Sequence, residues 1–93
     1  MLVGICQLEL FIPESNSLKS KRYIIKSLKT RIRNKFNISI AEVGDTEKWQ
    51  RTNLGISTVS NDRKVIDNTF NQIMKLVNSD VRVELIDKYI DIY

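Results

Sequence analysis

The segment SLKSKRYIIKSLKTRIRNKFNISIAEV, residues 17–43, decides the fold, because its apolar residues change from one spacing to another. In the first part, apolar side chains recur at every fourth position: Ile24, Leu28, Ile32 and Phe36. That spacing forms one stripe along an α-helix, and Ser17 is a suitable N-cap. From residue 38 onward, apolar residues alternate with small or polar ones, as in a strand with one buried face. The segment therefore predicts a helix over Ser17–Phe36 and a short strand over Ile38–Val43.

The flanking sequence adds elements on both sides of this segment. Leu2–Ile12 alternates apolar and polar residues in its second half, which predicts a strand that ends before Pro13. Gln50–Ser60 alternates in the same way and predicts another strand. A second amphipathic helix follows the capping residues 60–62 and runs to about Asn78.

A last strand is expected over Val81–Tyr93, but its apolar residues change phase. The first ones fall on odd-numbered positions: Val81, Val83 and Leu85. The later ones fall on even-numbered positions: Ile86, Ile90 and Ile92. A β-bulge near Asp87 and Lys88 would reconcile the two sets, since a bulge adds one residue to one strand of a pair.

The chain is therefore expected to form a single domain over residues 1–93 with the order βαββαβ. Two right-handed β-α-β crossovers place both helices on one face of a four-stranded antiparallel sheet. This is the ferredoxin-like arrangement of the α+β class, with the first and third strands in the centre. The residues expected in the core are Leu8, Leu10, Ile24, Leu28, Ile32, Ile40, Leu54, Ile56, Phe70 and Ile73.

The composition argues against an enzyme. The chain has no histidine, which is the commonest acid–base group near neutral pH. Its one cysteine, Cys6, lies on the apolar side of a strand, where a thiol serves as a small hydrophobic group. No residues have metal-ligand spacing, and no glycine-rich loop could hold a phosphate. We expect a non-catalytic protein without metal or cofactor, and a small-ligand enzyme is the least favoured function. No apolar run is long enough for a membrane span, so a cytoplasmic location is the default expectation.

Five short segments are informative in combination: SLKSKR at 17–22, FNISIAEV at 36–43, WQ at 49–50, LGI at 54–56 and VSND at 59–62. Together they closely resemble the YlxP-like family of small bacterial proteins, over essentially the whole chain. The resemblance implies a ferredoxin-like fold. It implies no defined activity, because the family is a domain of unknown function. Its genes often lie among those for transcription elongation and translation initiation factors and a ribosome-binding factor, which favours a role with RNA or the ribosome.

Basic residues are concentrated in one part of the chain. Residues 15–41 carry eight basic residues and no acidic one, whereas the rest carries seven basic and eleven acidic residues. Five of the eight form one line along the predicted helix, which we call the basic row: Lys19, Arg22, Lys26, Lys29 and Arg33. Like charges at this spacing repel one another, and a polyanion would relieve the repulsion. The basic row therefore predicts contacts with RNA phosphates, and the alternative is a solvated helix face that only maintains solubility.

Two further residues have two possible roles each. Lys21 falls within the apolar stripe at the first turn of the predicted helix. It either reaches out of the helix end or pairs with a carboxylate such as Glu42, or it points at a ligand across the end of the sheet. With the basic row, it completes the candidate nucleic-acid-binding residues. Trp49, where the second hairpin turns, is either an anchor over the sheet end or an interface residue.

The sheet face opposite the helices is expected to be small, partly apolar and without charge. The positions inferred there are Ile5, Gln7, Glu9, Ser39, Ala41, Val43, Asn53, Gly55 and Ser57. They include no aromatic pair on which bases could stack, so binding in the manner of an RNA-recognition motif is not expected. Such a face suits a second copy of the chain, and we expect a homodimer. The alternative function is therefore a homodimeric protein-interaction module with no nucleic-acid role.

Overall fold

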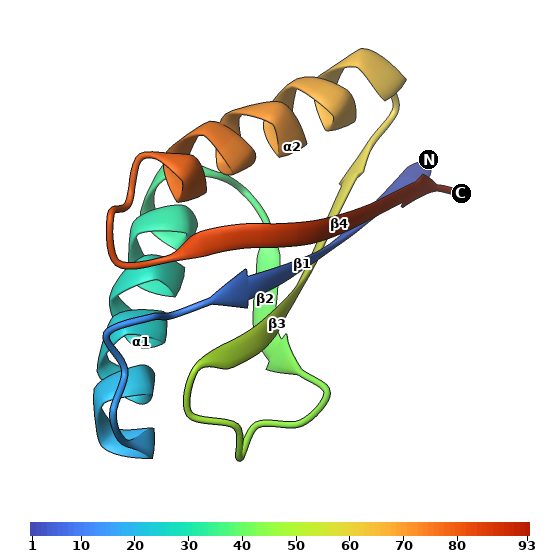
Figure 1. Cartoon of the computed structure of the whole chain (residues 1–93). Helices are drawn as coiled ribbons and strands as arrows, with labels where there is room; N and C mark the ends of the chain where they lie inside the picture. The colour runs from blue at the N-terminus through green and yellow to red at the C-terminus, as the bar shows by residue number, and fades with distance from the viewer.

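The computed structural model describes residues 1–93 and has the order βαββαβ (Figure 1). The elements are β1 (Leu2–Phe11), α1 (Leu18–Lys35), β2 (Ser39–Val43), β3 (Arg51–Ser60), α2 (Arg63–Asn78) and β4 (Glu84–Ile92). The first five elements begin and end within about one residue of the predicted positions. The predicted element order is confirmed.

The four strands form one antiparallel sheet with the order β2-β3-β1-β4. β1 pairs with β3 along its whole length on one side and with β4 on the other, so the first strand of the chain is central. Because side chains alternate along a strand, Cys6, Leu8 and Leu10 all face the same side. Both helices pack against this side, and the opposite face of the sheet stays open (Figure 1).

The core is one cluster of 17 buried apolar residues between the sheet and the two helices. All ten residues predicted for the core belong to it. α1 contributes Ile24, Ile25, Leu28 and Ile32. α2 contributes Ile66, Phe70, Ile73, Met74 and Val77. Both amphipathic stripes therefore meet the sheet as predicted, and neither helix combines the length and apolar composition that a membrane span requires.

Gly4 allows α2 to pack close to the central strand. A Cβ atom at this position would collide with the Cγ2 atom of Ile66 and would lie 3.0 Å from the ring of Phe70. Because protein interiors are packed to crystal-like density, α2 would have to move away from β1 to accommodate that atom. The absence of a side chain at Gly4 therefore fixes the distance between β1 and the first half of α2.

β4 is shorter than predicted, and its bulge lies one residue earlier. Leu85 and Asp87 pair with successive residues of β1, so Ile86 is the extra residue of the bulge. The predicted position was Asp87 and Lys88. Val81 precedes the strand and is 95% exposed, so the segment before Glu84 belongs to the α2–β4 connection. The bulge reverses which side chains of β4 face the helices.

Candidate nucleic-acid interface

The basic row lies on a helix that begins at a well-formed cap. Ser17 Oγ accepts a hydrogen bond of 3.0 Å from the backbone N–H of Ser20, which confirms the predicted N-cap. The first turn of α1 contains no acidic residue, although carboxylates are favourable at this end of a helix. The last turn contains Arg33 and Lys35, which suit the negative end of the helix dipole. α1 therefore keeps a positive charge along its whole length.

The side chains of the basic row lie along α1 on the side next to the edge strand β2. Its exposed members are Lys19, Arg22, Lys26 and Arg33, and Lys29 is half-buried. All except Lys19 line a shallow pocket of about 360 Å³, to which β2 contributes Glu42. The structure therefore brings four of the five predicted phosphate contacts to one groove between α1 and β2.

No side chain of the basic row forms an ion pair. The carboxylate in the groove, Glu42, is paired with Lys21, which does not belong to the row. Arg33 Nη2 donates a hydrogen bond of 3.1 Å to the carbonyl oxygen of Ile40, which holds the guanidinium beside the sheet edge. A carbonyl oxygen does not neutralise the charge. The basic row therefore presents uncompensated positive charge, which is what binding to phosphates requires.

Lys21 has a different environment from the basic row. The residue is 1% exposed, and its ammonium lies 2.7 Å from Glu42 Oε2 and donates a 3.1 Å hydrogen bond to the carbonyl of Thr46. Glu42 also accepts a 2.6 Å hydrogen bond from the hydroxyl of Thr52. Of the alternatives predicted for Lys21, pairing with Glu42 is confirmed. Because its ammonium is enclosed, Lys21 is not placed to contact phosphate, and we leave it out of the candidate interface.

Two other basic residues are held by one buried carboxylate at the end of α2. Arg31 Nη1 and Arg82 Nη2 lie 3.1 and 2.7 Å from Asp80 Oδ2, and the Asp80 side chain is only 3% exposed. Arg82 also donates a 3.2 Å hydrogen bond to Ser27 Oγ of α1. The hydrogen bond from Arg82 lowers the pKa of Asp80 below its ordinary value. This cluster joins the second half of α1 to the segment after α2, and the charge of Arg31 is already matched there by a carboxylate.

Cys6 lies in the core, as its strand position predicts. Its side chain is fully buried, and this burial raises the pKa of the thiol to about 11. The positive charge of Lys88 acts in the opposite direction and lowers the pKa, but burial has the larger effect. The thiol therefore stays protonated near neutral pH and acts as a small apolar group.

The open face of the sheet differs from the prediction in two respects. After the bulge, Tyr89 and Asp91 of β4 lie opposite Gln7 and Ile5, on the side away from the helices. Tyr93 follows on the same side, and Tyr89 and Tyr93 are 55% and 66% exposed. The expected lack of an aromatic pair on this face is therefore wrong. The expected lack of charge is also wrong. Glu9, one of the positions inferred for this face, is charged and lies 3.7 Å from Arg51 Nη1, and Asp91 accepts a 3.2 Å hydrogen bond from the Tyr89 hydroxyl.

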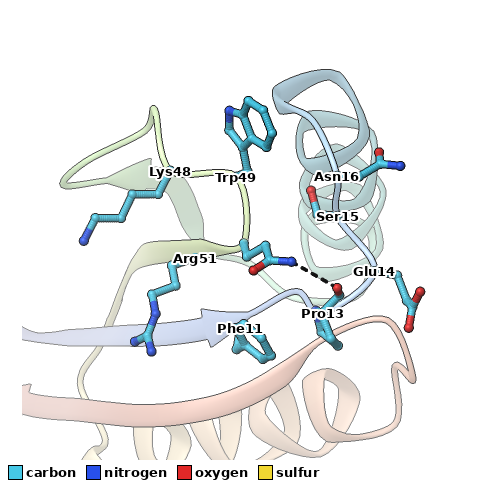
Figure 2. Close-up of a pocket in the computed structure, with 9 residues that line it drawn as sticks. Phe11, Pro13, Glu14, Ser15, Asn16, Lys48, Trp49 and Arg51 are labelled. Atoms are coloured by element: carbon cyan, nitrogen blue, oxygen red, sulfur yellow. Dashed lines mark hydrogen bonds between the residues drawn. The ribbon is translucent and has the colours of Figure 1, made fainter.

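A larger pocket of about 750 Å³ lies where the β1–α1 and β2–β3 loops approach each other (Figure 2). Its lining residues are Phe11, Pro13, Glu14, Ser15, Asn16, Lys48, Trp49, Gln50 and Arg51. Trp49 lies on the β2–β3 side, and its indole projects toward the β1–α1 loop (Figure 2). The residue is 55% exposed, so the indole is not a buried anchor of the hairpin. None of these residues was predicted as part of a pocket, because the two loops are far apart in sequence.

Comparison with known proteins identifies the family. A family model described as "Protein of unknown function (DUF503)" matches residues 3–90. The chain belongs to this family. It is also 36% identical over 83 residues to the uncharacterized protein YlxP of Bacillus subtilis (strain 168), a match that covers 89% of this chain and 90% of that protein. The resemblance to YlxP-like proteins is therefore confirmed.

A solved structure supports the fold of this DUF503 protein. The solution NMR structure of the de novo designed protein LFR1 1, which has a ferredoxin fold, superposes with a TM-score of 0.59. The match covers 97% of this chain and 85% of the designed one, with 11% sequence identity. At this identity the similarity shows the fold alone, and it confirms the ferredoxin-like arrangement predicted from the sequence.

Proposed function

We propose that this protein is a non-catalytic, cytoplasmic accessory protein that binds RNA, free or in the ribosome, through the basic row of α1. One observation carries the proposal: the basic row presents five cations along one helix face without a single carboxylate partner. Other basic residues nearby, such as Lys21 and Arg31, do have such partners. A helix face that served only solubility would not need one sign of charge.

Contacts with phosphates determine what kind of binding is expected. Phosphate contacts provide affinity and position but do not distinguish sequences. Binding through the basic row should therefore be tolerant of RNA sequence and should weaken steeply as salt rises. If each of the five cations meets one phosphate, log affinity should fall against log salt with a slope of about −3.5 on single strands and about −4.5 on a B-form duplex.

A double substitution on α1 tests the proposal. Arg22→Gln with Lys29→Gln should weaken binding evenly across RNA sequences and reduce the salt slope by roughly 1.5 to 2. The matched control is Arg63→Gln with Lys75→Gln, which removes the same two kinds of charge from exposed positions of α2. The control should keep the parent slope. Equal binding of parent and α1 variant, to RNA and to ribosomes sedimented on a gradient, would show that the basic row is only a solvated face.

A second candidate function is a homodimeric protein-interaction module that uses the open sheet face. It is favoured by three partly or well exposed apolar or aromatic residues on that face: Ile5, Val59 and Tyr89, exposed by 37%, 55% and 55%. Light scattering of this protein at about 100 μM should then give the mass of a dimer, since that concentration saturates a micromolar association. A monomer mass would count against it, and so would a dimer mass that persists when Ile5 and Val59 are replaced by Ser.

A further inference from the structure

The 750 Å³ pocket combines three kinds of chemical group (Figure 2). Its apolar surface comes from Phe11, Pro13 and Trp49. Its amide and hydroxyl groups come from Ser15, Asn16 and Gln50. Its charged groups are Lys48 and Arg51, which extend on one side of the pocket, and Glu14, which lies on the opposite side (Figure 2).

Hydrogen bonds within the protein hold together the two loops that form the pocket, without any ligand. The backbone N–H of Ile12 donates a 2.8 Å hydrogen bond to the carbonyl of Gln50, and the Gln50 amide donates a 3.2 Å hydrogen bond to the carbonyl of Pro13. Lys21 secures the β2–β3 loop to α1 through its 3.1 Å hydrogen bond to the carbonyl of Thr46. A ligand would therefore enter a site whose walls need little ordering, which lowers the cost of binding.

This set of groups matches a nucleotide. A half-exposed indole offers a flat face on which a base can stack, and every base has such a face. The amide oxygen of Gln50 accepts no hydrogen bond within the protein, so it can accept one from the edge of a base. Lys48 can contact phosphate on the side away from Glu14. Arg51 lies 3.7 Å from Glu9 Oε2, but its side chain is 52% exposed and its other N–H groups can contact the same phosphate. Proteins recognise unpaired bases of single-stranded RNA by this combination of stacking and edge contacts.

The pocket also lies at one end of the basic row. Asn16 lines the pocket, and Lys19, the first member of the row, follows three residues later in the first turn of α1. Arg22 follows after another turn. A strand whose phosphates follow the row toward the N-terminus of α1 would therefore deliver its next nucleotide to the neighbourhood of Trp49.

We propose that this pocket binds an unstacked base of single-stranded RNA, which stacks on Trp49. Lys48 and Arg51 contact the phosphates next to that base, and the basic row contacts those that follow. The inference rests on the proposed function and adds to it a preference for single strands over duplexes. Bases in a duplex are paired and stacked, so they cannot enter the pocket.

Trp49 is the only tryptophan of the chain, so its fluorescence reports on the pocket directly. Titration with a short oligoadenylate should quench the fluorescence of the whole protein, whereas a blunt-ended RNA duplex of equal length should bind without quenching. Anisotropy of labelled RNA should show that Trp49→Ala weakens single-strand binding by about tenfold or more, and that Trp49→Phe retains most of it. Tyr89→Ala, which removes an exposed aromatic ring from the open sheet face, is the matched control and should bind like the parent.

The same measurements separate failure of the pocket from failure of the basic row. Unchanged single-strand affinity of Trp49→Ala, together with weakened binding of the Arg22→Gln, Lys29→Gln variant, would overturn the pocket and leave the proposed function standing. If Trp49→Ala lost affinity and the Arg22→Gln, Lys29→Gln variant bound like the parent, the pocket would be supported and binding through the basic row would be refuted. A Trp49 emission that changes with protein concentration, before any RNA is added, would place the indole between copies of the chain and overturn the inference.

Discussion

The buried ion pair between Lys21 and Glu42 allows a quantitative test of how α1 is held to the β2–β3 hairpin. Its two members differ in access to water: the side chain of Lys21 is 1% exposed and that of Glu42 is 18% exposed. Removal of the carboxylate leaves an enclosed ammonium with only the carbonyl of Thr46 as partner. Removal of the ammonium leaves a carboxylate that still accepts the hydrogen bond from Thr52 and can reach water. The two single substitutions should therefore have unequal costs.

Glu42→Leu should destabilise the protein by about 3–5 kcal/mol, the usual cost of leaving a buried charge unpaired. Lys21→Met should cost only about 1–2 kcal/mol, because its methylene stem is preserved and the remaining carboxylate is partly hydrated. In the double variant both charges are gone, and the main remaining cost is about 1–3 kcal/mol for the Thr52 hydroxyl that has lost its acceptor. The double variant should thus be more stable than Glu42→Leu alone, with a coupling energy of about 3–4 kcal/mol between the two sites.

Urea unfolding of the four proteins, followed by far-UV circular dichroism, measures these free energies. The slope of the transition should be the same for all four, so that shifts in midpoint report stability alone. Should Glu42→Leu lack a measurable folded state, the ranking of Lys21→Met, the double variant and the parent still tests the reasoning. A double variant less stable than Lys21→Met by about 3 kcal/mol or more would show that Glu42 stabilises the fold chiefly through contacts other than its pair with Lys21, such as that with Thr52. Additive costs of the two single substitutions would show that the two charges do not interact, and either result would refute the unequal roles assigned to them.

Three further outcomes are expected. Gly4→Ala should lower the free energy of unfolding by about 1–3 kcal/mol in urea titrations, because the new methyl group collides with Ile66; a neutral effect would show that α2 shifts freely. Asp80→Asn should cost about 2 kcal/mol at pH 7, since the carboxylate binds two guanidinium groups. Folding lowers the pKa of Asp80, so the carboxylate makes its full contribution to stability above its ordinary pKa of 3.8. That contribution is lost as the pH falls through the pKa of Asp80 in the folded protein. Thermal unfolding against pH should therefore decline less steeply on the acid side for the variant than for the parent. With a pKa of about 11, on the order of one Cys6 in a thousand is a thiolate at pH 8, so iodoacetamide should label Cys6 only in urea; rapid labelling of the native protein would contradict the burial.

The helices and the core were predictable because their signals are local and repeated. Ile24, Leu28 and Ile32 recur at the period of a helix, and Leu8 and Leu10 recur at the period of a strand. A single misplaced residue does not change such a pattern. The order of elements then leaves few topologies, because crossovers in a sheet are right-handed. Periodicity together with handedness was enough for the ferredoxin-like arrangement.

The face assignment of β4 was not predictable to the same degree. A strand has a period of two, so one extra residue moves every later side chain to the opposite face. Ile86 is that residue, and its position depends on pairing with β1 rather than on any residue type. The phase change of the apolar residues did indicate a bulge, but it fixed the site only to within about a residue. Both sites precede Tyr89, so either one places Tyr89 and Tyr93 on the open face. The two tyrosines were missed because the last strand, whose phase was uncertain, was left out of the residues assigned to that face.

The candidate sites likewise differ in how far they could be predicted from local sequence. The basic row followed from spacing alone, because a helix brings residues three and four apart together. The partner of Lys21 could be suggested from charge, but choosing between pairing and exposure required the packed structure. The pocket beside Trp49 depends on hydrogen bonds between two loops, such as that from Gln50 to Pro13, and no local pattern encodes them.

The pairing of β1 with β4 also has a consequence for synthesis of the chain. Val3 and Tyr93 exchange two backbone hydrogen bonds, of 3.0 and 2.9 Å, so the two ends of the chain lie side by side (Figure 1). The central strand is translated first and receives its second neighbour last, after about 80 further residues, which takes roughly 4–16 s at typical rates of translation. Until then one edge of β1 has unpaired N–H and C=O groups, and such an edge can pair with another chain. A nascent chain that stalls before β4 would therefore be prone to aggregation, and the domain can close only when its last strand has emerged.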